Sequence, residues 1–154
     1  MKIINIRGVI GRDIKPEDIQ KQLNGAKGQD IELQINSPGG LVTQGIEIYN
    51  MLNNYKGNII TKVTGLAASM GSIIALAGKN KPIVYKNSMF MIHNVQGIAM
   101  GDHNELKKEA EVMERISNMM GRLYAKKSGK KFEDINNLCK CSKHLHSYKK
   151  TSLH

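Results

Sequence analysis

Residues 31–52, IELQINSPGGLVTQGIEIYNML, decide the fold, because they contain a strand pattern, a glycine-rich connection and a helix pattern in that order. Residues 31–35 alternate apolar and polar side chains, which is typical of a half-buried strand. In the connection, Ser37-Pro38-Gly39-Gly40, the glycines can adopt backbone angles closed to other residues and bring an N–H close to a ligand. An ordinary turn is the simpler interpretation of the same four residues. The helix pattern comes from apolar residues at helical spacing: Val42, Ile46, Tyr49 and Leu52.

Strand-like and helix-like patterns continue to alternate along the chain. Further strands are expected at 59–63, 83–85 and 89–93, and further helices at 69–77 and 102–127. The last helix has Asp102 and Glu105 at the spacing of a capping box and stops at Ser128-Gly129. We therefore predict an α/β fold of stacked βαβ-type units with right-handed crossovers.

The composition narrows the class of protein. A chain of 154 residues has the size of one domain, and 40% hydrophobic with 23% charged residues argues against a disordered or fibrous chain. No stretch approaches the roughly 20 apolar residues that span a membrane. The first eight residues, MKIINIRG, lack the features of a secretory signal, so we expect a cytoplasmic protein.

The net charge of +10 raises nucleic acid as a partner, but much of it is local. Residues 139–154 carry four lysines and no acid, which leaves +6 for residues 1–138. Because no helix-turn-helix or base-stacking motif accompanies the charge, no nucleic acid partner is expected. We expect a domain over 3–138 and a disordered, basic tail over 139–154.

The tail also contains metal-ligand atom types, in the order Cys139, Cys141, His144 and His146. This spacing is tighter than that of common zinc sites, and a C-x-C pair agrees with a reducing compartment. A flexible chain end is the simpler interpretation. We expect neither a metal nor a cofactor.

Two residues could carry chemistry. Ser69, in GLAASMG at 65–71, follows a strand pattern and opens a helix, where unpaired backbone N–H groups could stabilise an oxyanion. Serine is also a favoured N-cap, so a capping role stays open. His93 ends the apolar run MFMIH, where it is either a general base or a hydrogen-bonded core histidine.

Taken together, NSPGG at 36–40, GLAASMGS at 65–72 and MFMIHN at 89–94 resemble the proteolytic subunit of the Clp protease family in order, spacing and neighbours. The resemblance covers about residues 3–138 and implies a crotonase-like Clp protease fold in which the long helix is a protruding handle. It implies a cofactor-free serine endopeptidase that cleaves polypeptides and assembles into homo-oligomeric rings, stacked in pairs through the handles.

The resemblance also assigns roles at the site. Ser69 corresponds to the nucleophile and His93 to the general base. The backbone N–H groups of Gly40 and Met70 correspond to the oxyanion hole. Gly39 and Leu41 lie where the family binds the substrate backbone as an added strand.

Three departures from the family qualify this interpretation. The sequence starts at the first strand, without the family's axial gate, which favours the phage or prophage branch that processes capsid or scaffold proteins during head maturation. An unfoldase ATPase partner is therefore not expected. Val95 replaces the usual proline after the base. The family's catalytic Asp corresponds to Ser142, and Asp134 matches only the helix before that acid.

The third triad member is thus unknown, and losing this acid in a serine protease costs roughly 10⁴ in rate, about 5 kcal/mol. An impaired or inactive subunit with a role in assembly is therefore a second hypothesis. A third is an acyl-CoA hydratase or isomerase of the crotonase fold, which shares a glycine oxyanion hole but generally relies on carboxylates.

Overall fold

The computed structural model describes residues 1–140 and the backbone of residues 146–147. The chain forms two compact units, the first from residues 1–91 with the strand at 146–147, and the second, within the described residues, from 92–140. Within the described residues, no helix is long and apolar enough to cross a membrane.

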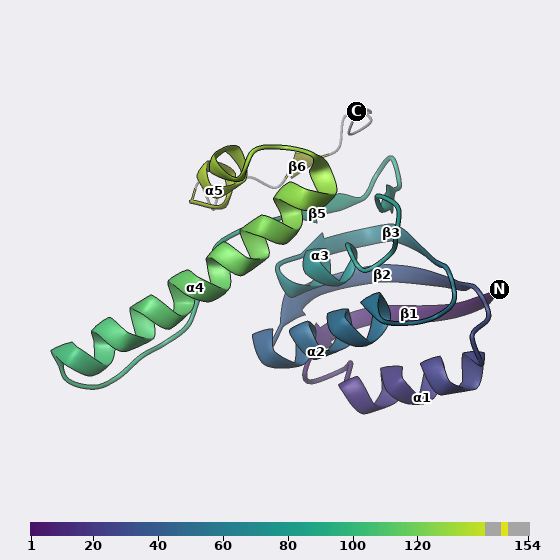
Figure 1. Cartoon of the computed structure of the whole chain (residues 1–154), viewed down its shortest axis with the longest axis horizontal. Helices are drawn as coiled ribbons and strands as arrows, with labels where there is room; N and C mark the ends of the chain where they lie inside the picture. The colour runs from purple at the N-terminus through teal and green to yellow at the C-terminus, as the bar shows by residue number, and fades with distance from the viewer. Residues whose placement is uncertain (141–145, 148–154) are drawn as a thin grey trace. The chain divides into compact units, whose positions relative to one another are not determined.

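The first unit is a sheet that alternates with helices along the chain (Figure 1). Its elements are β1 (Lys2–Ile10), α1 (Pro16–Ala26), β2 (Ile31–Gly40), α2 (Val42–Asn53), β3 (Ile59–Ala68), α3 (Met70–Ile74), β4 (Ile83–Val84), β5 (Met89–Met91) and β6 (His146–Ser147). The strand order is β1-β2-β3-β5-β6, with β4 also paired to β3. All pairs are parallel except β5 with β6, which confirms the predicted α/β class.

The core lies between the sheet and its helices. Alternate residues of β1 and β2, such as Ile4, Ile6, Leu33 and Ile35, are completely buried. Because the successive β-α-β connections advance in the same direction across the sheet, right-handed crossovers put α1 and α2 on one face. Ile19 and Leu52 bring the apolar sides of these helices to that core.

β2 and β3 both extend beyond the sequence-based expectation, and β3, expected at 59–63, continues to Ala68. Ser37-Pro38-Gly39-Gly40 was expected after the end of a strand, but β2 continues through Gly40 and stays paired with β1 up to Ile10. A register shift between Arg7 and Val9 allows this continuation. The glycine pair therefore has a backbone fixed by the sheet instead of lying in a separate turn.

Two shorter elements were also predicted too long. The helix expected at 69–77 is α3, Met70–Ile74, followed by tight turns in which Leu76 and Ala77 donate to the carbonyls three residues before. The strand expected at 89–93 ends at Met91, and Met89 is exposed, because β5 pairs over only three residues. His93 accordingly lies beyond the strand.

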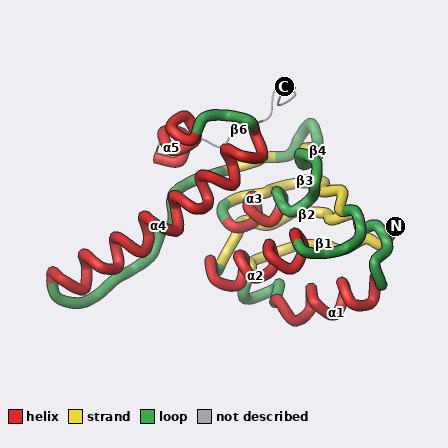
Figure 2. Tube along the Cα trace, viewed as in Figure 1, coloured by secondary structure: helices red, strands yellow, loops and turns green. Residues whose placement is uncertain are grey.

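The second unit holds α4 (His103–Ser128) and α5 (Phe132–Lys140), which Figure 2 shows as helices joined by a short connection. The expected capping box is confirmed: the Asp102 carboxylate accepts the Glu105 N–H, and the Glu105 carboxylate accepts the Asp102 N–H. α4 ends at Ser128, at the predicted Ser128-Gly129 stop, and Gly129 follows in the left-handed conformation. Residues 139 and 140, which the sequence pattern assigns to the tail, form the last turn of α5.

Candidate active site

Ser69 occupies a strained turn between β3 and α3. Its φ of 53° and ψ of −126° lie in a region that favours glycine, and holding a serine there costs about 1–3 kcal/mol. The Ser69 N–H donates to the Met91 carbonyl at 3.1 Å, and its carbonyl accepts the Ser72 N–H at 3.0 Å. These bonds hold the strained backbone between β5 and the first turn of α3.

The Ser69 side chain makes no capping hydrogen bond to α3, although the residue occupies the N-cap position. The capping role, which the sequence left open, therefore does not explain this serine. A serine on a strained strand-to-helix turn is instead the arrangement that exposes a nucleophilic hydroxyl in α/β-hydrolases.

The glycines that end β2 lie against this turn. A Cβ placed on Gly39 would come within 2.7 Å of Ser69 Cβ and 3.0 Å of the Met70 nitrogen. A Cβ placed on Gly40 would overlap the Ile10 carbonyl oxygen and lie 2.7 Å from the Ile10 nitrogen. Both glycines have positive φ values, 100° and 148°. The backbone of β2 thus approaches both the serine and the start of α3 as only glycine permits.

Met70 is the first residue of α3, so its N–H has no partner within the helix. Its side chain is completely buried and packs against α2, where a Cβ on Gly45 would lie 3.1 Å from Met70 Cβ. This packing fixes the N-terminal end of α3 beside Gly39. An oxyanion formed at Ser69 would meet a backbone donor in this first turn.

Gly39 and Leu41 use their N–H groups within the protein. The Gly39 N–H donates to Ser37 Oγ at 3.1 Å, and the Leu41 N–H donates to the Ile10 carbonyl at 2.9 Å. The Leu41 carbonyl accepts the Gly45 N–H at 3.0 Å, and the Leu41 side chain is exposed. Substrate binding through these two residues remains a prediction.

His93 belongs to the second unit, two residues after β5 ends, and is half-buried. Burial lowers the pKa of its imidazole, and a backbone hydrogen bond at Asn94 partly opposes that shift. A lowered pKa keeps the imidazole neutral near pH 7, as a general base requires. The approach of His93 to Ser69 remains a prediction.

The structure describes only some of the residues singled out near the C-terminus. Ser142 lies outside the described residues, as do Cys141 and His144. Among residues that are described, no three histidine, cysteine or acidic side chains gather as a metal site. Cys139 is buried in α5, and burial raises the pKa of its thiol.

Ser37 is the residue whose contacts the sequence pattern did not reveal. Its hydroxyl donates to the Gly8 carbonyl at 2.7 Å and accepts the Gly39 N–H. The signal was present, because Leu33, Ile35 and Ser37 are alternate residues of one strand and so point to the same buried face. A hydroxyl on that face requires partners.

The fold and the site define an α/β protein with a strained serine at a strand-to-helix turn and glycine-rich backbone packed against it. Comparison with known proteins identifies the family: the model named Clp protease matches residues 2–149, and the chain belongs to the Clp protease family.

Two relatives are described as the ATP-dependent Clp protease proteolytic subunit. The subunit of Oltmannsiellopsis viridis is 37% identical over 110 residues, which cover 71% of this chain and 56% of the relative. The subunit of Ligilactobacillus salivarius (strain UCC118) is 39% identical over 109 residues, 70% of this chain and 55% of the relative. The chain thus spans about half the length of these curated relatives.

Proposed function

We propose that this chain is a serine endopeptidase subunit that cleaves polypeptides through an acyl-enzyme. The observation that carries the proposal is Ser69: a strained residue, uncapped at its hydroxyl, with Gly39 and the first amide of α3 against it. Family membership and two relatives described as proteolytic subunits support the same activity.

The reaction follows from these groups. Ser69 Oγ attacks the peptide carbonyl while its proton passes to the neutral imidazole of His93. The N–H groups of Gly40 and Met70 hold the carbonyl oxygen as it becomes an oxyanion. The imidazolium then protonates the leaving amine, the C–N bond breaks, and water activated by the same imidazole hydrolyses the ester.

Assembly into rings is part of the proposal. In the second unit, several large apolar side chains are exposed, which a lone subunit would leave in water: Ile98 (96%), Met100 (90%), Leu106 (43%), Val112 (47%) and Met119 (38%). We expect α4 to join two copies of the chain. Sedimentation velocity at micromolar concentration tests this, because a monomer would contradict it.

The polypeptide substrate and the ATP requirement are finer predictions. We propose phage capsid or scaffold proteins as substrates, cleaved without an ATPase in the cytoplasm, whereas both relatives are described as ATP-dependent. Cleavage of an unfolded polypeptide by the purified chain alone, without nucleotide, supports ATP independence. Cleavage that requires an added ATPase contradicts it.

The direct test of activity is cleavage of an unfolded polypeptide by the wild-type chain and by Ser69→Ala. We expect new peptide termini only with the wild type. Equal cleavage by the two proteins would identify a contaminant and refute the proposal.

A second candidate, an impaired subunit with a role in assembly, is favoured by Ser142 at the position of the family's catalytic acid. Ser142→Asp distinguishes the two. A gain approaching roughly 10⁴-fold would show that the natural chain lacks its orienting acid. An unchanged rate in an active protein would show that another group fills that role.

A further inference from the structure

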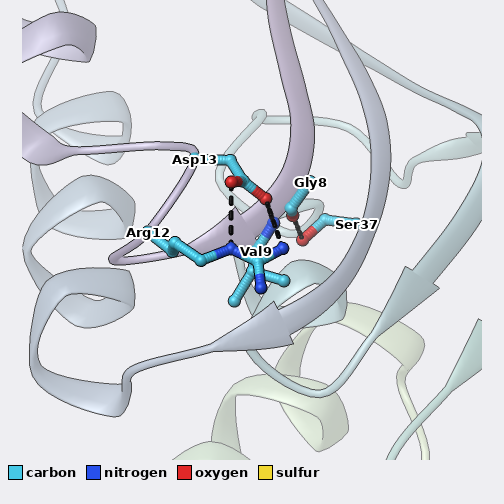
Figure 3. A network of polar contacts seen from close by, with 5 residues as sticks. All are labelled: Gly8, Val9, Arg12, Asp13 and Ser37. Atoms are coloured by element: carbon cyan, nitrogen blue, oxygen red, sulfur yellow. Dashed lines mark hydrogen bonds and ion pairs between the residues drawn. The ribbon is translucent and has the colours of Figure 1, made fainter.

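Ser37 is completely buried, at 0% exposed, yet it lies within the glycine-rich end of β2. A buried hydroxyl without partners is costly, and here both its donor and its acceptor functions are used. The hydroxyl donates to the Gly8 carbonyl at 2.7 Å, as Figure 3 shows, and accepts the Gly39 N–H at 3.1 Å. One side chain therefore bonds β1 to the backbone that precedes Gly40.

The hydrogen bond from the Gly39 N–H to Ser37 distinguishes Gly39 from Gly40. With its N–H held by Ser37, Gly39 has no amide to offer to a ligand. Two residues further on, the Leu41 N–H donates to the Ile10 carbonyl of β1 at 2.9 Å. The Gly40 N–H, which lies between these two amides along the chain, is the one assigned to the oxyanion.

Ser37 also lies directly beneath the first turn of α3. A Cβ placed on Gly71 would come within 3.1 Å of Ser37 Cβ and 3.3 Å of Ser37 Oγ. The preceding residue, Met70, carries the other amide assigned to the oxyanion. The same buried side chain is thus in contact with both segments that supply oxyanion donors.

The Gly8 carbonyl is itself fixed from the opposite side. Asp13 accepts the Val9 N–H at 2.8 Å and pairs with Arg12 at 3.0 Å (Figure 3). A Cβ placed on Gly8 would lie 2.6 Å from Asp13 Oδ2, so the turn closes tightly over this residue. The register shift between β1 and β2 therefore places a held carbonyl opposite Ser37.

We propose that Ser37 is a positioning residue: by occupying the Gly39 N–H and the Gly8 carbonyl, it directs the Gly40 N–H to the oxyanion and sets its spacing from Met70. The proposal rests on the proposed peptidase function. Ser37 does not touch the reacting atoms itself. It acts only through the backbone of Gly39, Gly40 and the first turn of α3.

The test compares Ser37→Ala with Ser88→Ala. Ser88 is also buried, and its hydroxyl donates to the Val63 carbonyl at 3.0 Å, so its variant loses a similar bond away from the site. The first measurement is inactivation by a fluorophosphonate, separated into the binding constant KI and the maximal rate kinact. The second is hydrogen–deuterium exchange of a peptide spanning residues 36–41.

For Ser37→Ala we expect kinact to fall about 10- to 100-fold with KI within about twofold, because the phosphonyl oxygen uses the oxyanion donors. For Ser88→Ala, both constants should stay within about twofold. The 36–41 peptide should exchange faster only in Ser37→Ala. A kinact for Ser37→Ala equal to that of Ser88→Ala would overturn the proposal.

The two proposals fail in different ways. If the wild-type chain is not labelled at Ser69, the peptidase function fails, and with it any oxyanion role for Ser37. If the wild type is labelled but exchange of residues 36–41 is the same in Ser37→Ala as in the wild type, only the positioning role is refuted.

Discussion

The two units of the chain hold candidate site residues of different kinds. In the first unit, Ser69, Gly39 and Met70 are positioned by main-chain geometry: strand ends, glycines and the start of a short helix. In the second unit, the predicted base is one side chain, His93, half-buried after the end of β5. The acid that would orient it is not assigned: the resemblance to the family points to position 142, which is a serine here and lies outside the described residues.

The first group of residues depends on the main-chain fold, whereas the second depends on the properties of one side chain. The proposed oxyanion donors are peptide groups, so their positions persist as long as the sheet and α3 persist. A base depends on one imidazole, its tautomer and its pKa. We therefore expect substitution of His93 to change the rate alone, and substitution of Gly39 to change rate and stability together.

The largest effect is expected from His93→Ala. Removing the base should lower fluorophosphonate labelling of Ser69 by about 10⁴-fold, because the hydroxyl then has no proton acceptor. The free energy of unfolding should change little, since the side chain is only half-buried. His103→Ala, at the exposed start of α4, is the matched control and should label at the wild-type rate. Equal labelling of both variants would remove His93 from the mechanism.

Glycine substitutions test the residues positioned by main-chain geometry. Gly28 has a φ of 81° and open space around its Cα, so Gly28→Ala costs only conformational strain, about 1 kcal/mol. Gly39 has a φ of 100°, and its new Cβ would press on Ser69. We expect Gly39→Ala to cost about 2 kcal/mol more than Gly28→Ala in urea unfolding and to abolish labelling. Equal costs would show that β2 does not pack against Ser69 as described.

Much of this architecture follows from sequence patterns, and the exceptions have physical causes. Alternation in β2 and the Asp102–Glu105 capping box are local signals, and both elements formed where they were expected. The continuation of β2 through Gly40 is not local, because it depends on pairing with Ile10 about 30 residues away. No element was assigned to α1, although Pro16 at its start and buried Ile19 and Leu23 carry a helix signal.

In the candidate site, too, local sequence signals could be recognised, whereas contacts between distant segments could not. Ser69 and the glycine pair could be singled out from their neighbours in sequence, but the strained backbone of Ser69 depends on contacts with β5 and Gly39. The partners of Ser37 could not be predicted, because they require the register shift in β1 that brings Gly8 to it.

Backbone strain at Ser69 gives a smaller and separate effect. Ser69→Gly should be about 1–2 kcal/mol more stable than Ser69→Ala, because only glycine adopts a φ of 53° with a ψ of −126° freely. Urea unfolding of the two variants measures the difference. Neither has a hydroxyl, so the comparison isolates the strain from the chemistry. If Ser69→Gly were no more stable, the turn would not be strained.

The smallest expected effect is a shift in the pH dependence of Ser69 labelling. Because burial lowers the pKa of His93, its neutral form persists below the ordinary value near 6.5. The labelling rate should therefore be constant at pH 7 and above, and fall only as pH drops through the depressed pKa. Any stability that the neutral, buried imidazole contributes is likewise lost as the pH falls through this pKa. A midpoint above 6.5 in the rate profile would contradict this environment for His93.

The central claim, that Ser69 is a nucleophile activated within this fold, is tested most directly by one labelling measurement. The wild-type chain and Ser69→Ala are treated with a fluorophosphonate, their intact masses are determined, and the modified peptide is sequenced by fragmentation. We predict a single adduct on Ser69 in the wild type and none in the variant. No adduct on the folded wild-type chain, or an adduct that persists in Ser69→Ala, would contradict the claim.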